Sequence, residues 1–210
     1  MKRIAVVVAL VCLATVGFAG DLSFGIGASG SYFSSDTKLT SAGISQDVTT
    51  TEIPYNLFVY VESTNLQLAV GYRTFDGMTV KGQGGTSEVS AKYSYLSLAG
   101  YGKFPLHLGS VVLIPMIGVE YDVTLDATLS GVSADSQTLS DLNALWIKAG
   151  LGAEIPLSPS FYFRPEFLFG YQLNNQFDRD LVNIYKGMGF DDASILELNF
   201  ELALLFGVKL

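Results

Sequence analysis

The C-terminal end of the chain alternates between apolar side chains and side chains that are mostly polar or small. From Leu196 to Leu210 every even-numbered residue is apolar, while the odd-numbered residues include Glu197, Glu201 and Lys209. A period of two places the two sets on opposite faces of a β-strand, whereas an α-helix would mix them. This segment therefore predicts a long strand with one apolar face and one polar face.

The same alternation recurs upstream and predicts an all-β protein. It is clear in 22–29, 66–73, 145–154 and 161–172, and weaker in 53–62, 92–104 and 111–123. With the C-terminal segment this makes eight segments of about ten residues, the length that a tilted strand needs to cross a bilayer. The expected fold is an eight-stranded antiparallel up-and-down transmembrane β-barrel.

The lengths of the connections between these segments support the same fold. In chain order the connections are 35–52, 63–65, 76–91, 105–110, 124–142, 156–160 and 173–194. Long and short connections alternate, which is typical of outer-membrane barrels with short periplasmic turns and long extracellular loops. An even number of strands then places both chain ends in the periplasm.

The composition favours a membrane barrel over a soluble barrel of the same period. Hydrophobic residues make up 49% of the chain and charged residues only 15%, yet no apolar run after residue 19 is long enough for a membrane helix. The outer face of a soluble barrel would need dense charge, whereas these polar faces carry few charges between Gly, Ala and Ser. A closed barrel satisfies every backbone group in lipid, so the apolar faces are expected to point outward.

Aromatic residues near the strand ends are expected to form two interfacial girdles. Those toward the outer ends are Tyr32, Phe33, Tyr55, Tyr72, Phe75, Tyr93, Tyr121 and Tyr171, and those toward the periplasmic ends are Phe104, Phe161 and Phe163.

The first 19 residues have the pattern of a secretory signal peptide. Lys2 and Arg3 precede an apolar run from Ile4 to Phe18, and the small residues Gly17 and Ala19 favour cleavage after position 19. The remaining domain, 20–210, then has ten basic against 20 acidic residues and no cysteine. Its net charge argues against nucleic acid as a partner. We expect export to the outer membrane, with outer-membrane lipid as the main partner.

The chain resembles the small eight-stranded outer-membrane barrels, such as the OmpA membrane domain, OmpX and OmpW. In those proteins the last strand alternates apolar residues and ends in an aromatic residue; Leu202, Leu204, Phe206 and Val208 match, while Leu210 replaces the aromatic. The resemblance implies periplasmic chaperones and the barrel-assembly machinery as partners during biogenesis. It implies no cofactor.

If the polar faces point inward, ionisable residues of both signs meet in the lumen. The outer half receives Arg73, Glu120, Lys148, Glu197 and Glu201; the periplasmic half receives Glu62, Lys103, Glu154, Arg164 and Lys209; Glu166 lies nearer the middle. Buried charges of mixed sign are expected to pair. The lumen is then either a structural ionic plug or a narrow gated pore for small solutes. An OmpW-like passage of small hydrophobic molecules is an alternative, because Pro115 and Pro165 remove ladder hydrogen bonds from the wall.

The sequence predicts neither an enzyme nor a metal site. His107, the sole histidine, falls in a periplasmic turn, and an acidic group in the last loop (Asp178, Asp180, Asp191 and Asp192) is better explained as a solvated surface than as a calcium site. The remaining alternative is surface adhesion or binding of an extracellular ligand through the long loops. The last loop is unusually apolar, with Tyr185 and Met188 among its residues, and is expected either to fold as a short helix or lid at the barrel mouth or to contact a partner.

Overall fold

The computed structural model describes residues 22–41, 44–82, 85–188 and 192–210. The predicted signal peptide, 1–19, lies outside the described residues. The strands are β1 (Ser23–Ser41), β2 (Ile44–Glu52), β3 (Tyr55–Glu62), β4 (Leu66–Gly82), β5 (Gly85–Lys103), β6 (Leu106–Leu108), β7 (Val111–Leu129), β8 (Val132–Ser133), β9 (Ala144–Pro156), β10 (Phe161–Asn175) and β11 (Asp192–Lys209). The helices are α2 (Ser136–Asp141) and α3 (Gln176–Gly187).

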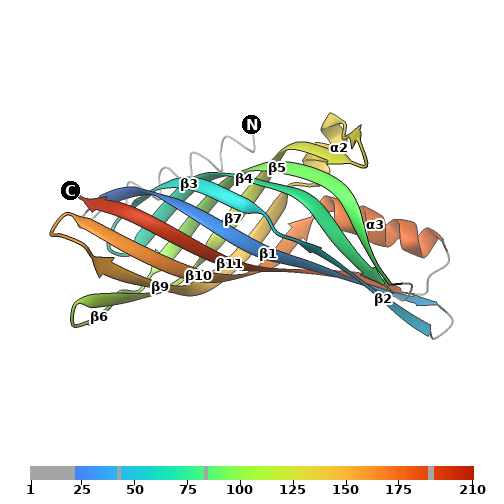
Figure 1. Ribbon diagram of the computed structural model, residues 1–210. Helices are drawn as coiled ribbons and strands as arrows, with labels where there is room; N and C mark the ends of the chain where they lie inside the picture. The colour runs from blue at the N-terminus through green and yellow to red at the C-terminus, as the bar shows by residue number, and fades with distance from the viewer. Residues whose placement is uncertain (1–21, 42–43, 83–84, 189–191) are drawn as a thin grey trace.

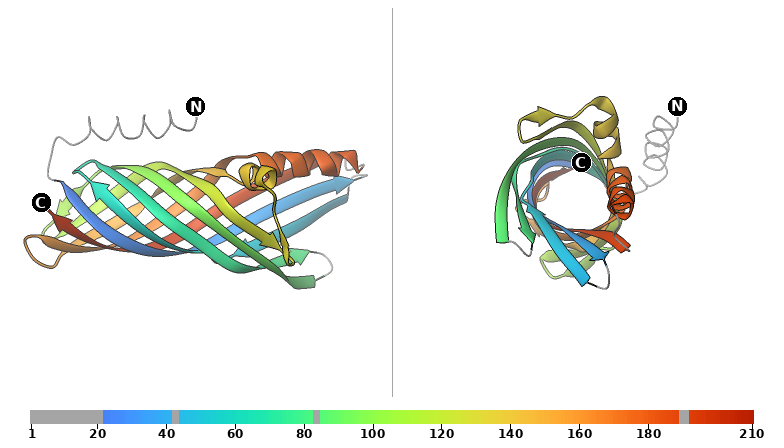
Figure 2. Two further views of the ribbon diagram at one scale, coloured as in Figure 1. Left: turned by 90° about the horizontal axis from the view of Figure 1, so that it is seen from above. Right: turned by 90° about the vertical axis from the view of Figure 1, so that its right-hand side faces the viewer.

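Eight of the described strands form a closed antiparallel ring, in the order β1, β3, β4, β5, β7, β9, β10 and β11. The ring closes between the first and last strands, where β1 pairs with β11 from Ser23↔Lys209 to Thr40↔Asp192. Closure leaves no unpaired strand edge in the wall, which is the condition for a sheet to lie in lipid. The predicted eight-stranded up-and-down barrel is confirmed (Figures 1 and 2).

The barrel extends further on its outer side than the sequence pattern predicts. The connections 35–52 and 76–91 were expected to be loops. Their described parts, 35–41, 44–52, 76–82 and 85–91, instead lie in strands: β1 and β2 form one hairpin and β4 and β5 another. The two hairpins also pair with each other from Thr49↔Lys81 to Glu52↔Met78. The β-branched residues at 48–51 suit a paired strand, although their polarity had suggested a solvated loop.

The chain passes from β2 to β3 through Ile53 and Pro54. Both strands pair with β1 and β4, β2 with their outer parts and β3 with the parts nearer the periplasm. The amide of Ser31 donates to the carbonyl of Pro54 at 3.0 Å, so the wall stays connected at this break. Because β3 supplies the eighth strand of the ring, β2 belongs to the extension beyond the membrane-spanning wall.

Two connections on the outer side carry the helices. Asp135 caps α2 by accepting a hydrogen bond from the Thr138 amide at 2.8 Å. The last long connection contains α3, in agreement with the first of the two alternatives for that loop, and α3 contacts β11 and α2. The end-on view in Figure 2 shows α3 and α2 beside the mouth. In the described part of the chain, neither helix is long and apolar enough to cross a membrane.

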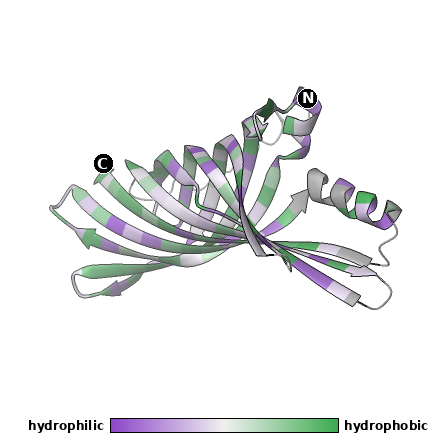
Figure 3. Cartoon of the chain, turned by 45° about the vertical axis from the view of Figure 1, so that its right-hand side comes forward, coloured by the Kyte–Doolittle hydropathy of each residue, from purple (hydrophilic) through white to green (hydrophobic). Residues whose placement is uncertain are grey.

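The outer surface of the ring is apolar. Ile26, Leu57 and Leu202 are 63%, 69% and 58% exposed, and Figure 3 shows hydrophobic residues alternating with polar ones along the strands. Removing so much exposed apolar surface from water requires lipid around the barrel. The predicted orientation, with apolar faces outward, is therefore confirmed.

The predicted aromatic girdles are correct only in part. Exposed aromatic residues at the outer side include Tyr32, Tyr55, Tyr72 and Tyr171, and those at the periplasmic side include Phe104 and Phe161. Phe33, Phe75 and Tyr93 were wrongly assigned to the outer girdle, because their side chains line the interior. Their strands continue past the membrane, and alternate side chains still point toward the interior there. These three rings occupy inward-facing positions of that alternation.

Close packing inside the barrel explains one of the interior glycines. The Tyr162 ring, 1% exposed, lies directly over Gly207, where a Cβ atom would collide with the ring. We expect Gly207→Val to lower the free energy of unfolding by about 1–3 kcal/mol, because the ring must be displaced from a packed interior. Denaturant unfolding in lipid vesicles measures this change. Gly30→Ala, with open space around the new Cβ, is the control; an equal loss in both variants would contradict the packing argument.

Candidate functional site

The periplasmic half of the interior holds a group of paired side chains that we call the inner cluster: Glu62, Gln67, Lys103, Arg164 and Glu166. Arg164 is fully buried and donates two hydrogen bonds of 2.9 Å to the Glu62 carboxylate. It also donates to Glu166 at 2.7 Å and to Gln67 at 2.6 Å. Lys103 completes the cluster with a 2.7 Å ion pair to Glu62. The cluster contains two cations and two carboxylates, so its formal charges balance.

Aromatic and rim residues surround the inner cluster. Tyr162 donates a short hydrogen bond to Glu62, and Tyr60 donates to the Tyr162 hydroxyl at 3.0 Å. The Arg164 guanidinium also lies 5.6 Å from the centre of the Tyr162 ring. Nearer the periplasmic rim, Lys209 forms a 2.6 Å ion pair with Glu154. These contacts hold Arg164 in place from several sides.

The outer half of the interior holds a second group, the outer cluster: Arg73, Glu120, Asp122, Lys148 and Glu201. Arg73 lies 2.7 Å from both Glu120 and Asp122. Lys148 is fully buried between Glu120 and Glu201, at 2.9 and 2.6 Å. With two cations and three carboxylates, the outer cluster has a formal charge of −1 when all five groups are ionised.

The structure brings together most of the residues that the sequence pattern had assigned to the lumen. Glu62, Lys103, Arg164 and Glu166 meet in the inner cluster, Glu154 and Lys209 pair at the rim, and Arg73, Glu120, Lys148 and Glu201 meet in the outer cluster. Glu197 differs, because it lines a pocket farther out. Asp122 was missed, although its position two residues after Glu120 places it on the same face of β7.

Little space remains between the two clusters. The cavity there has a volume of about 20 Å³ and is lined by Gln67 and Glu166 on one side and by Glu120 and Glu201 on the other. That volume holds about one water molecule. Among the described side chains, the two clusters and this small cavity fill the middle of the barrel.

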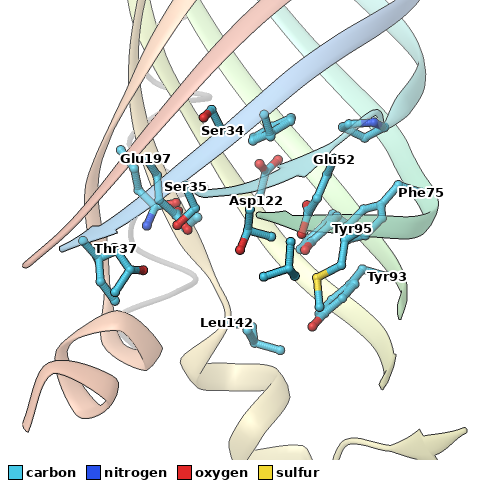
Figure 4. Close-up of a pocket in the computed structure, with 18 of the residues that line it drawn as sticks. Ser34, Ser35, Thr37, Glu52, Phe75, Tyr93, Tyr95, Asp122, Leu142 and Glu197 are labelled. Carbon is cyan, nitrogen blue, oxygen red and sulfur yellow. The ribbon is translucent and has the colours of Figure 1, made fainter. Parts of the chain in front are cut away.

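A much larger cavity, which we call the mouth pocket, lies outward of Arg73 and Asp122. Its volume is about 400 Å³, and its walls come from the extended hairpins, β7, β9, β11 and α3. Figure 4 shows the side chains of Glu52, Asp122 and Glu197 approaching it from three different strands. Tyr185 of α3 also lines it. The extra strand length beyond the membrane therefore creates the cavity.

Aromatic rings form much of the wall of the mouth pocket. Phe75 and Tyr93 stack with ring centres 4.8 Å apart, and Phe33 meets Trp146 edge to face at 5.1 Å. Several buried polar atoms of the lining residues have no hydrogen-bond partner among the described residues, among them Nε1 of Trp146, one carboxylate oxygen of Asp122 and Nε of Arg73. A wall of rings with a few polar atoms is typical of a small-molecule site.

The mouth pocket carries a negative charge. In the part of the chain that the structure describes, its lining includes the acidic residues Glu52, Asp122 and Glu197 and a single cation, Arg73. Glu52 lies in β2, outside the membrane-spanning wall, and burial raises the pKa of its carboxyl to about 7. Within the described chain, the Glu52 side chain forms neither an ion pair nor a hydrogen bond.

Pro115 and Pro165 suggested either a sideways passage through the wall or a local bulge. Pro115 remains within the β7–β9 pairing opposite Leu151. At Pro165 the β9–β10 pairing does have a gap, between Phe163↔Ile155 and Glu166↔Gly152. The adjacent Arg164 lies behind this gap in the inner cluster, where its contacts hold it. The gap is therefore a local irregularity of the β9–β10 pairing, and side chains of the inner cluster fill the interior behind it.

No metal centre is found in the part of the chain that the structure describes, where no three His, Cys, Asp or Glu side chains gather in a suitable arrangement. Asp191, one of the four acidic residues of the last loop, lies outside that part. His107 lies exposed in β6, at the end of the barrel that also carries the C-terminus (Figure 1).

Comparison with known proteins finds similarity in structure alone. No family model and no curated protein matches the sequence. The outer membrane protein OprG from Pseudomonas aeruginosa matches with a TM-score of 0.51 at 14% identity, over 92% of this chain and 97% of OprG. Neisserial surface protein A matches with a TM-score of 0.46 at 14% identity, over 89% and 97% of the two chains. With its closed ring and apolar wall, the chain has the fold of the small eight-stranded outer-membrane β-barrels, and the outer membrane is its location.

Proposed function

We propose that this protein is a closed outer-membrane barrel that binds a small molecule in the mouth pocket and conducts no solutes. One observation carries the proposal: a cavity of about 400 Å³ lies directly outward of two ion-paired clusters that have room for about one water molecule between them. The clusters then act as a structural ionic plug, and binding takes place on the cell-surface side of that plug.

The hydrogen bonds and ion pairs within the clusters favour a permanent plug rather than a gate that opens. A gate must open at a small cost in free energy, yet Arg164 makes four charged or polar hydrogen bonds that would all break if it moved. Lys148 is held between two carboxylates in the same way. Separating buried ion pairs leaves uncompensated charges in a medium of low dielectric constant, which is costly.

The proposal assigns no enzymatic activity, catalytic residue or cofactor to the chain. Support comes from the position of His107, which lies at the periplasmic end, far from the mouth pocket. Lipid contacts the apolar wall. Periplasmic chaperones and the barrel-assembly machinery are proposed as partners during biogenesis, since a barrel with this wall must cross the periplasm before it reaches lipid.

Ion flux through the protein in liposomes tests the plug. We expect the wild-type protein to leak no more than empty vesicles, and the variant Glu62→Ala/Arg164→Ala to stay tight because the outer cluster remains. Adding Arg73→Ala and Glu120→Ala should open the lumen and produce measurable flux. A heat-dependent shift in gel mobility checks the folding of each variant. Flux in the wild type, or after disruption of one cluster alone, would show a gated pore and overturn the proposal.

A second candidate function is surface adhesion, which the extended hairpins favour. They carry polar, exposed residues beyond the membrane, such as Ser45, Gln46 and Asp47 in β2 and Thr86, Ser87 and Glu88 in β5. Deleting 177–190 should abolish adhesion if α3 contacts a partner. Unchanged adhesion after that deletion and after shortening of the hairpins would exclude this function.

A further inference from the structure

We infer that the mouth pocket selects small organic cations, molecules that carry an ammonium group on an apolar or aromatic body. The inference rests on the proposed function, because it assumes that the mouth pocket is a binding site, and it adds the chemical class of the ligand. Three properties of the mouth pocket lead to it: its charge, its aromatic wall and the position of Glu52.

The charge of the lining favours cations over anions. Among the described residues that line the mouth pocket, Arg73 is the only cation, and its guanidinium already lies 2.7 Å from both Glu120 and Asp122. Glu52 and Glu197 add two further carboxylates from β2 and β11. An anion entering this space would meet carboxylates from several strands, whereas a cation would be attracted to them.

The aromatic wall suits a cation with an apolar body. Phe33, Phe75, Tyr93, Tyr95 and Trp146 all line the mouth pocket. Phe75 stacks on Tyr93, Phe33 meets Trp146 edge to face, and Arg73 already lies over the Phe33 ring. The negative face of an aromatic ring attracts an ammonium group, and the remaining ring surface favours the apolar part of the ligand. A volume of about 400 Å³ suits a compact ligand.

Glu52 is the residue that we expect to select a positively charged ligand. Its half-buried carboxyl has no ion-pair or hydrogen-bond partner among the described residues, and Figure 4 shows it among the aromatic side chains of the mouth pocket. A bound ammonium group would provide the missing counter-charge. The other ionisable groups that line the mouth pocket around Glu52 are Arg73, Tyr93, Tyr95, Asp122, Tyr185 and Glu197.

Three related probes separate charge from shape. Phenyltrimethylammonium is the cation, tert-butylbenzene is its neutral isostere, and benzenesulfonate is an anion with the same ring. Trp146 is the only tryptophan of the chain and lines the mouth pocket, so its fluorescence reports occupancy. With the full chain in lipid nanodiscs, we expect saturable binding of the cation, at least tenfold weaker binding of the isostere, and no response to the anion.

Glu52→Gln is the decisive variant, and Glu88→Gln is its matched control. Glu88 lies exposed on β5 outside the mouth pocket. Loss of one partly buried counter-charge should weaken cation binding by about tenfold in Glu52→Gln, while Glu88→Gln should bind as the wild type does. The gel-mobility shift confirms that both variants are folded.

The pH dependence of binding identifies the group responsible. Burial raises the pKa of Glu52 to about 7. Below that pH the carboxyl is protonated and neutral, so cation affinity should rise as the pH increases from 6 to 8. Glu52→Gln lacks this carboxyl and keeps the other ionisable groups of the mouth pocket, so the rise in its cation affinity over the same range should be much smaller than in the wild type.

The possible failures are distinguishable. Equal or tighter binding of tert-butylbenzene, or unchanged cation affinity in Glu52→Gln, would overturn the cation inference and leave an apolar ligand site as the proposed function. Absence of any fluorescence response to all three probes, together with ion flux through the wild-type protein, would overturn the proposed function itself.

Discussion

Replacing Arg164 by glutamine is expected to lower the free energy of unfolding by about 3–5 kcal/mol. The substitution removes the guanidinium that contacts Glu62 and Glu166 and leaves two fully buried carboxylates with Lys103 as the remaining cation of the inner cluster. Denaturant unfolding in lipid vesicles, followed by the gel-mobility shift, measures the change. No substitution on the barrel surface is expected to have an effect of this size.

Two further variants show that the loss comes from buried charge. Arg164→Gln/Glu166→Gln restores the charge balance of the inner cluster and should recover part of the lost stability. Lys92→Gln breaks an ion pair with Asp76 whose two side chains are 61% and 66% exposed, and should cost less than about 1 kcal/mol. If Arg164→Gln costs no more than Lys92→Gln, the inner cluster is hydrated and the account of the plug is wrong.

The second large effect is expected for Lys148→Met, again with a loss of about 3–5 kcal/mol. Methionine fills much of the space of the lysine stem, so the change isolates the loss of a charge that lies between Glu120 and Glu201. Arg73 would then be the only cation facing three carboxylates. The same unfolding measurement applies, with Lys148→Met/Glu201→Gln as the variant that recovers stability.

The two losses also test whether the clusters are separate. Arg164 and Lys148 share no ion-pair partner, so the effects of Arg164→Gln and Lys148→Met should be additive within about 0.5 kcal/mol. A double variant that loses far less than the sum would indicate one continuous network and would contradict the division into two clusters.

The two-residue alternation along the strands was sufficient to predict that most of the charged residues in the wall point inward. Arg73, Lys148 and Arg164 occupy polar positions of clearly alternating segments, and all three are buried. The alternation could not predict which charged residues form ion pairs with one another. Arg164 meets Glu62 from 102 positions away, and only the closing of the ring and the relative shift of its strands decide such a meeting.

The mouth pocket could not be predicted from the sequence. Polar residues at 35–52 resembled a solvated loop, so Glu52 received no role, and Phe75 and Tyr93 were assigned to the girdle. Their true positions depend on the continuation of two hairpins past the membrane and on the pairing between those hairpins. Such pairing is stabilised by contacts between distant segments, which composition does not reveal.

The sequence by itself determined the eight strands, the direction of their apolar faces and most of the buried charges, because a two-residue period is a local property of a strand in lipid. Tertiary structure alone decided which charges pair, how little space remains between the two clusters, and where the wall continues into a cavity. These features depend on strand register around a closed ring, and register is a relation between segments that no single segment contains.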